Sequence, residues 1–338
     1  MSNHLHLDRR GTLGLAALGL SAMAYGAAPA GAAVPTRARQ RSDSALTVTL
    51  LGTGSPVPSI ERMGNSTLVQ AGGYNLVFDG GRGLPIRLVQ AGLHCGQIDG
   101  IFLTHYHSDH VNGVADAWMM GYVPALGART KALDLYGPTG VHRLAAGLRL
   151  AHADDIRVRV ADKEVNPAAA ALESHESQVN DAVVFNRDGV VVRMFEVDHD
   201  KADAITPAVG YRVDYRGHSV LISGDTRPCE NVIKWGRSVD LLIHEVADFL
   251  DPTDPVIQGV YEHHTSPQQA GKIFDATRPQ MAAYSHIVAG IPPRFPEVPI
   301  ATLVDRTREN YGGALTVGED LLTFTIDNSG IDVVRATG

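Results

Sequence analysis

The feature that most constrains this chain is the segment THYHSDH at residues 104–110. The apolar run Ile101–Thr104 predicts a buried strand that leads straight into it. A strand ending here brings three imidazoles and one carboxylate to a single turn at a sheet edge. These are ligands of Zn²⁺, iron and Mn²⁺, and their mixture on one loop suits two adjacent ions. A solvated histidine-rich loop is the alternative, but chance would rarely produce this arrangement.

Three further candidate ligands each stand just beyond an apolar run that predicts a strand: His199, Asp225 and His286. A lone histidine or aspartate in such a place is usually a cap or turn residue. Their order along the chain, together with residues 104–110, favours metal ligands over cap or turn residues. Each strand would bring one polar side chain to a sheet edge.

The arrangement of apolar runs predicts strands in a meander, then strand–helix units, then the same pattern again. That order fits two sheets packed face to face with helices outside. Residues 153–180 give no clear pattern, apart from a short helix or loop at 167–172. Strands are predicted at 46–51, 66–70, 75–78, 190–197, 208–215, 219–223, 241–244, 281–284 and 321–326, and helices at 114–122, 141–150, 266–276 and 298–311.

The first 33 residues differ in kind from the rest. Arg9 and Arg10 precede an apolar run, residues 13–24, that is too short to span a bilayer. A small-residue stretch follows, which is the order of a cleavable export signal similar to the twin-arginine type. We therefore expect a signal at 1–33, a linker at 34–45, a hydrolase domain at 46–338, and a periplasmic protein without a membrane anchor after cleavage. A disordered tail is the alternative.

The net charge of the chain argues against nucleic acid as a binding partner. The formal net charge is -8, from 29 Lys and Arg against 37 Asp and Glu, which provides no basic surface for a long nucleic acid. Losing Asp8, Arg9 and Arg10, a net +1, would leave a net charge of -9.

The two cysteines, Cys95 and Cys229, lack a CxxC spacing and are expected to be buried thiols. A disulfide between them stays an open alternative.

Taken together, LGTGSP at 51–56, HxHxDH at 105–110, His199, SGDT at 223–226 and His286 resemble the metallo-β-lactamase superfamily. The likeness covers residues 46–326. It is greatest to the branch that holds tRNA 3′-processing ribonuclease Z and metallo-type arylsulfatases. The resemblance implies an α/β fold, the αββα sandwich of two mixed sheets flanked by helices.

The resemblance also implies a dinuclear metal site. His105, His107 and His199 would hold one divalent transition-metal ion, and Asp109, His110 and His286 the other, with Asp225 bridging them. Zinc is expected, with manganese and iron as alternatives. Two ions at such a site can share a hydroxide that attacks a phosphorus, sulfur or carbonyl centre. Asp109 is counted among the catalytic residues as well as the ligands.

Glu245 and His264 are the other catalytic candidates. In the similar nucleases a histidine here protonates the leaving group and a glutamate orients it, and such a pair suits acid catalysis near neutral pH. Structural roles at a strand end and a helix start are the alternative. His263 makes the assignment ambiguous, but the following Thr-Ser favours His264.

For substrate, we expect a small anionic ester, a sulfate ester or a phosphodiester. Residues 140–200 contain six acidic side chains between 154 and 176 and no basic or Gly/Pro-rich arm of the kind that grips tRNA. A ribonuclease Z-like tRNA endonuclease, a lactonase and a non-catalytic metal-binding scaffold are the alternatives. A homodimer is allowed, and a nucleic-acid partner is not expected.

Overall fold

The computed structural model describes residues 45–178, 181–200, 202, 205 and 207–335. The predicted export signal at 1–33, and the linker at 34–45 except for Ala45, lie outside these residues. The first strand, β1 (Leu46–Gly52), begins at the residue where the sequence predicts the fold to begin.

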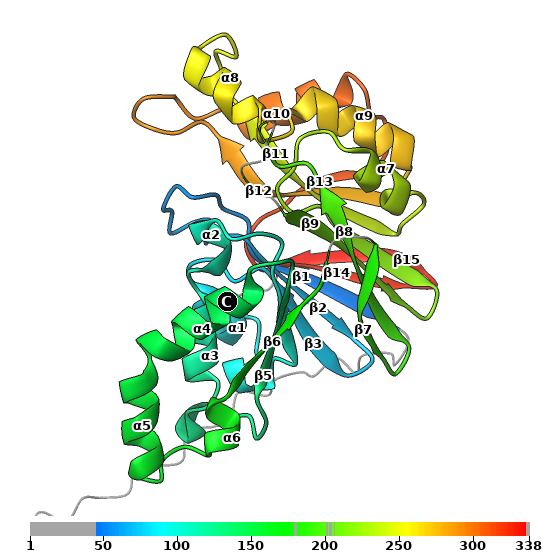
Figure 1. Ribbon diagram of the computed structural model, residues 1–338. Helices are drawn as coiled ribbons and strands as arrows, with labels where there is room; N and C mark the ends of the chain where they lie inside the picture. Colours follow the sequence, from blue (N-terminus) through cyan, green and yellow to red (C-terminus); the bar gives the residue numbers. More distant parts are fainter. Residues whose placement is uncertain (1–44, 179–180, 201, 203–204, 206, 336–338) are drawn as a thin grey trace, which may run out of the picture. The chain divides into compact units, whose positions relative to one another are not determined.

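The first sheet has eight strands in the order β15-β14-β1-β2-β3-β4-β5-β6. β14 pairs antiparallel with β1, placing Ile326 opposite Leu46, so segments from the two ends of the sequence lie side by side (Figure 1). From β3 to β6 the strands are parallel. The other strands of this sheet are β2 (Ser66–Ala71), β3 (Tyr74–Phe78), β4 (Gly100–Phe102), β5 (Leu133–Gly137), β6 (Leu172–Glu176), β14 (Leu322–Asp327) and β15 (Gly330–Arg335).

The second sheet has seven strands in the order β13-β12-β11-β10-β9-β8-β7. Strands β7 to β10 are antiparallel, and β10 to β13 are parallel, so this sheet is also mixed. Its strands are β7 (Ala182–Arg187), β8 (Val190–Val197), β9 (Ala208–Tyr215), β10 (His218–Ile222), β11 (Leu241–Asp248), β12 (Met281–Ala289) and β13 (Leu315–Val317).

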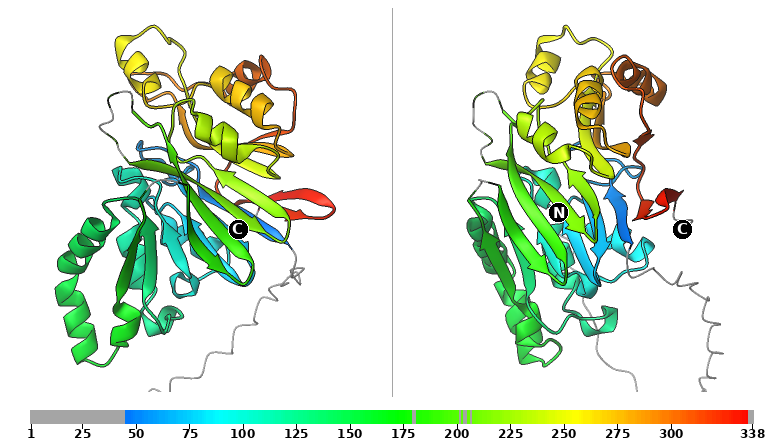
Figure 2. Two further views of the ribbon diagram at one scale, coloured as in Figure 1. Left: turned by 45° about the vertical axis from the view of Figure 1, so that its right-hand side comes forward. Right: turned by 90° about the vertical axis from the view of Figure 1, so that its right-hand side faces the viewer.

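The two sheets pack face to face because alternate side chains of their strands are apolar. On β8, Val192 and Met194 enter the core between the sheets, whereas Phe195 and Val197 enter a separate core on the outer face. Helices cover both outer faces (Figure 2). This arrangement confirms the predicted αββα sandwich.

Two sets of helices make the outer layers. On the first sheet they are α1 (Leu84–Gln90), α3 (Val114–Met120), α4 (Val141–Ala151) and α6 (Pro167–Ala170), and on the second α7 (Glu230–Gly236), α9 (Pro267–Thr277) and α10 (Ile300–Arg308). The remaining helices are α2 (Ser108–Val111), α5 (Ala153–Ala161) and α8 (Pro255–Tyr261), with short 3-10 turns at Cys95–Gln97 and Pro124–Leu126.

Several local expectations have clear outcomes. Ser266, the first residue of the helix predicted at 266–276, caps α9 with its hydroxyl oxygen, which accepts from the backbone N–H of Gln269. The undeciphered stretch 153–180 contains α5, α6 and β6. Cys95 and Cys229 are both free thiols, and Cys95 is buried as expected, whereas Cys229 is only partly buried. Among the described helices, none is both long and apolar enough to cross a membrane.

Candidate metal centre and acid pair

The histidine-rich segment leaves the first sheet as predicted, although β4 ends at Phe102, before Thr104. The short helix α2 then winds residues 108–111 into one turn. His105, Asp109 and His110 are buried, whereas His107 is exposed. The turn therefore aims its imidazoles and its carboxylate at a single place beside the sheet edge.

The second sheet supplies the remaining candidates from three alternate strands, β8, β10 and β12. His199 follows β8 and Asp225 follows β10, as predicted. His286 was expected beyond the end of its strand but lies inside β12, which continues to Ala289.

A bulge between β11 and β12 explains the position of His286. His244 pairs with Tyr284 and Val246 with Ile287, so Glu245 alone faces both Ser285 and His286. His286 has a φ of 44°, in the left-handed region. Such bulges re-aim side chains next to active sites, and here the bulge turns His286 toward Asp225. A non-glycine residue held at this φ costs about 1–3 kcal/mol, which the surrounding structure must offset.

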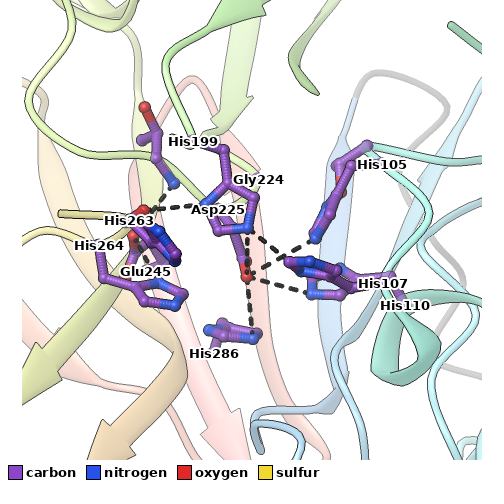
Figure 3. A network of polar contacts seen from close by, with 12 residues as sticks. His105, His107, His110, His199, Gly224, Asp225, Glu245, His263, His264 and His286 are labelled. Carbon is purple, nitrogen blue, oxygen red and sulfur yellow. Dashed lines mark hydrogen bonds and ion pairs between the residues drawn. The ribbon is translucent and has the colours of Figure 1, made fainter. Parts of the chain in front are cut away.

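The five histidines among the predicted ligands surround one carboxylate, that of Asp225 (Figure 3). Its Oδ2 atom lies 3.2 Å from His286 Nε2 and 3.3 Å from His110 Nε2. The same oxygen lies 3.7 Å from His199 Nε2 and 3.9 Å from His105 Nε2. These nitrogens come from both expected ligand sets, so Asp225 stands between the sets, where a bridging ligand would stand.

The ligand atoms also fall into the two expected groups. Those of His105, His107, His199 and Asp225 lie within 4.8 Å of one another, and so do those of Asp109, His110 and His286. The spacing and the mixture of imidazole and carboxylate suit divalent transition-metal ions.

The polar atoms inside the cluster support this fit. His105 Nε2 and Asp225 Oδ1 are buried and make no hydrogen bond with any residue that the structure describes. A buried polar atom left without a partner costs about 1–3 kcal/mol. Coordination of an ion would remove that cost, so the residues present fit the two divalent ions that the sequence predicts.

Burial prepares two of the histidines, His105 and His199, for ligation. Burial lowers the pKa of His199 to about 4 and holds the pKa of His105 well below its usual range. Both rings are thus neutral at neutral pH, which a metal ligand requires. Burial opposes ionisation of Asp225, but the surrounding imidazoles, His286 and His110 first, keep the pKa of its carboxyl well below normal.

A further carboxylate, Asp79, orients one of the ligands and was not predicted. Its Oδ2 lies 2.8 Å from His110 Nδ1, and its Oδ1 accepts from the backbone N–H of Thr104 at 2.8 Å. Asn65 donates to the same side chain at 3.2 Å. Such outer partners fix the orientation of a ligating histidine and raise its basicity. The only sequence signal was one aspartate directly after an apolar run.

The predicted acid pair lies beside the ligands. His264 Nδ1 is 3.1 Å from Glu245 Oε1, and that oxygen also accepts from the backbone N–H groups of Thr226 and Thr265. Figure 3 shows the pair on one side of Asp225, opposite His105 and His107. Burial opposes protonation of His264, but the Glu245 carboxylate outweighs it and raises the pKa of His264 to about 9.

Two observations decide between the neighbouring histidines. His264 contacts the Glu245 carboxylate and stacks on His286 with ring centres 5.6 Å apart, whereas His263 points to Asp200, 3.4 Å from its Nε2. His263 instead supports a ligand through its backbone oxygen, which lies 2.9 Å from His199 Nδ1. His264 also lies within 4.8 Å of Asp225 and His286, which allows ligation as a second role.

Comparison with known proteins gives a consistent result. The family model described as "Anti-Pycsar protein Apyc1" matches residues 46–253. A ribonuclease Z of Mycolicibacterium gilvum is 33% identical over 249 residues, covering 73% of this chain and 85% of that protein.

Two solved structures share the fold. The metallo-β-lactamase fold protein YhfI from Bacillus subtilis superposes with a TM-score of 0.62 at 17% identity, covering 83% of this chain and 99% of that one. The short form of human tRNase Z superposes with a TM-score of 0.58 at 21% identity, covering 82% of this chain and 98% of that one.

Proposed function

Because the chain belongs to the metallo-β-lactamase-fold hydrolases, the family of ribonuclease Z and of the Apyc1 model, we propose that it is a metal-dependent phosphodiesterase. The observation that carries the proposal is the His264–Glu245 pair, held at 3.1 Å beside both groups of candidate ligands.

The metal ligands and the acid pair act on opposite sides of the scissile bond. When bound, two divalent ions activate water and stabilise charge on the phosphoryl oxygens. His264 gives its proton to the leaving oxygen as the P–O bond breaks, and Glu245 holds the Nδ1 side of the ring in place. Zinc is proposed as the metal because imidazole nitrogens dominate the ligand set, with manganese and iron as alternatives.

The choice of phosphodiester over sulfate ester rests on the leaving group and on the relatives. Alkoxide leaving groups of phosphodiesters need protonation, which is the task that the pair suits. The curated relative described above is named for a ribonuclease, whose substrate bonds are phosphodiesters. None of the proteins compared above is named as a sulfatase, so the expected sulfate-ester activity has no support.

Ribonuclease Z-like cleavage of pre-tRNA is the second candidate. It is favoured by the 33% identity over 85% of the curated relative. Charge favours a small substrate instead. The arginines of the outlying helix α5 are paired, Arg157 with Asp154 at 3.1 Å and Arg159 with Asp155 at 3.1 Å. Paired arginines offer little to a phosphate backbone, and the whole chain carries a net charge of -8.

The test compares three substrates with the metal-loaded protein: bis(p-nitrophenyl) phosphate, p-nitrophenyl sulfate and a pre-tRNA. We expect hydrolysis of the phosphate diester with little dependence on salt, and none of the sulfate. Hydrolysis of the sulfate alone would refute the phosphodiesterase. Efficient cleavage of pre-tRNA that falls steeply with salt would establish the second candidate instead.

A further inference from the structure

A cleft of about 290 Å³ adjoins the metal cluster and shares His199 with it. One wall is the end of β8 and the loop after it, with Glu196, Asp198 and Asp200. The other wall is the start of α7, with Cys229 and Asn231. The cleft is therefore a space next to the reaction centre that the proposed chemistry does not yet use.

The cleft is rich in carboxylates, which alternate along the chain at positions 196, 198 and 200. Asp198 is paired with Arg227 at 2.8 Å, and Asp200 faces His263 Nε2 at 3.4 Å. Glu196 is exposed. Ionised carboxylates accept hydrogen bonds and do not donate them. The wall thus favours hydroxyl and amino groups and disfavours an anion.

The wall with Asp200 lies close to the proposed acid, His264. Asp200 contacts His263, and His263 precedes His264 in the chain. The His263 side chain is 41% exposed, and its ring centre lies 6.2 Å from that of His199. His263 and His264 lie on the same side of Asp225 (Figure 3), so a leaving group that takes its proton from His264 would depart past His263, which contacts Asp200.

We propose that the cleft binds the organic part of the leaving group and selects phosphodiesters whose leaving alcohol carries hydroxyl or amino groups and no second phosphate. The inference rests on the proposed phosphodiesterase activity and narrows its substrate class. It assigns to Glu196 and Asp200 a role in specificity through charge, with His263 positioning the Asp200 carboxylate, whereas Arg227 balances the charge of Asp198.

The experiment uses the metal-loaded protein with the dinucleoside monophosphate ApA and the same compound bearing a phosphate at either end, pApA and ApAp. We expect that one terminal phosphate, the one on the leaving side, raises KM about tenfold, equivalent to roughly 1.4 kcal/mol. Because the effect is charge repulsion, added salt should shrink the difference. Asp200→Asn and the exposed Glu196→Gln should shrink it too.

Asp162→Asn, an exposed carboxylate at the end of α5, is the matched control and should leave the difference intact. Elemental analysis of each variant checks that its metal content is unchanged. Equal KM for ApA, pApA and ApAp in the wild type overturns the inference, as does cleavage of bis(p-nitrophenyl) phosphate without cleavage of ApA. Either result leaves the phosphodiesterase intact, whereas no cleavage of any phosphodiester refutes the phosphodiesterase itself.

Discussion

The Asp79 carboxylate lies 2.8 Å from Nδ1 of His110, although 31 residues separate the two in the chain. Asp79 has a φ of 59°, so the chain turns sharply at the end of β3 and presents its carboxylate to that ring. A buried aspartate placed in this way supports a ligand without being one.

Removing this support should weaken metal binding. Asp79→Ala is expected to lower the affinity of the second ion about 10–100-fold, because His110 loses the partner that orients its ring. Asp79→Asn, which keeps an acceptor oxygen, should lose less. Titration against a competing chelator measures both, and circular dichroism checks the fold. Unchanged affinity in Asp79→Ala would show that the contact is only structural.

Asp225→Ala should release both ions rather than one. Its Oδ2 lies between 3.2 and 3.9 Å from nitrogens of both ligand groups, so its removal opens both sites. Elemental analysis should find about two ions per chain in the wild type and far fewer in the variant. His107→Ala is the control, because it belongs to one group only. Loss of a single ion from Asp225→Ala would argue against bridging.

His264→Ala should slow turnover of a phosphodiester with an alkoxide leaving group by about 10²–10⁴-fold. The loss should be much smaller with nitrophenolate, which leaves without protonation. Glu245→Gln should show the same pattern more weakly, since it acts on the orientation of His264. An equal loss with both substrates would instead point to a binding or structural role, and a loss of bound metal would assign His264 to the ligands.

The rate of turnover should decrease at high pH, where His264 loses its proton. The Glu245 carboxylate raises the pKa of His264 to about 9, so the ring is protonated below that pH and loses its proton above it. Bound cations repel that proton. Turnover of an alkoxide substrate should therefore fall as pH rises through a value at or below about 9. This decrease should be absent in His264→Gln. If turnover of the variant still decreases over the same pH range, another group is responsible.

The N-terminus provides a prediction about location. If residues 1–33 are an export signal, N-terminal sequencing of protein from fractionated cells should find a start near Ala33 or Val34, in the periplasmic fraction. Replacing Arg9 and Arg10 by lysine should retain the uncleaved chain inside the cell. An intact N-terminus in the cytoplasmic fraction of the wild type would contradict export.

The parts of the site that the sequence predicts are those with a local signal. His105 follows an apolar run, and Ser266 has the spacing of a helix cap. Local pattern could not place His286 correctly, because its direction depends on a bulge that forms only when β11 and β12 pair. For the same reason Asp79 looks like an ordinary turn residue until His110 is brought to it.

Two of the strands that the sequence missed, β6 and β15, lack a periodic pattern. β6 has the sequence LESHE, and only Leu172 is buried, because the strand lies at the edge of the first sheet. An edge strand with little buried surface carries no alternation to detect. β15 is an edge strand too, and none of its residues is fully buried.

The candidate ligands are divided between the two halves of the sandwich: residues 105–110 extend from the first sheet, and His199, Asp225 and His286 from the second. Ions held in common would therefore act as a removable cross-link between the halves, in addition to the apolar core. Bringing the halves together completes the site, and loss of the ions loosens their attachment. The protein's resistance to unfolding should then track metal supply in its surroundings, so scarcity would affect its lifetime as well as its turnover.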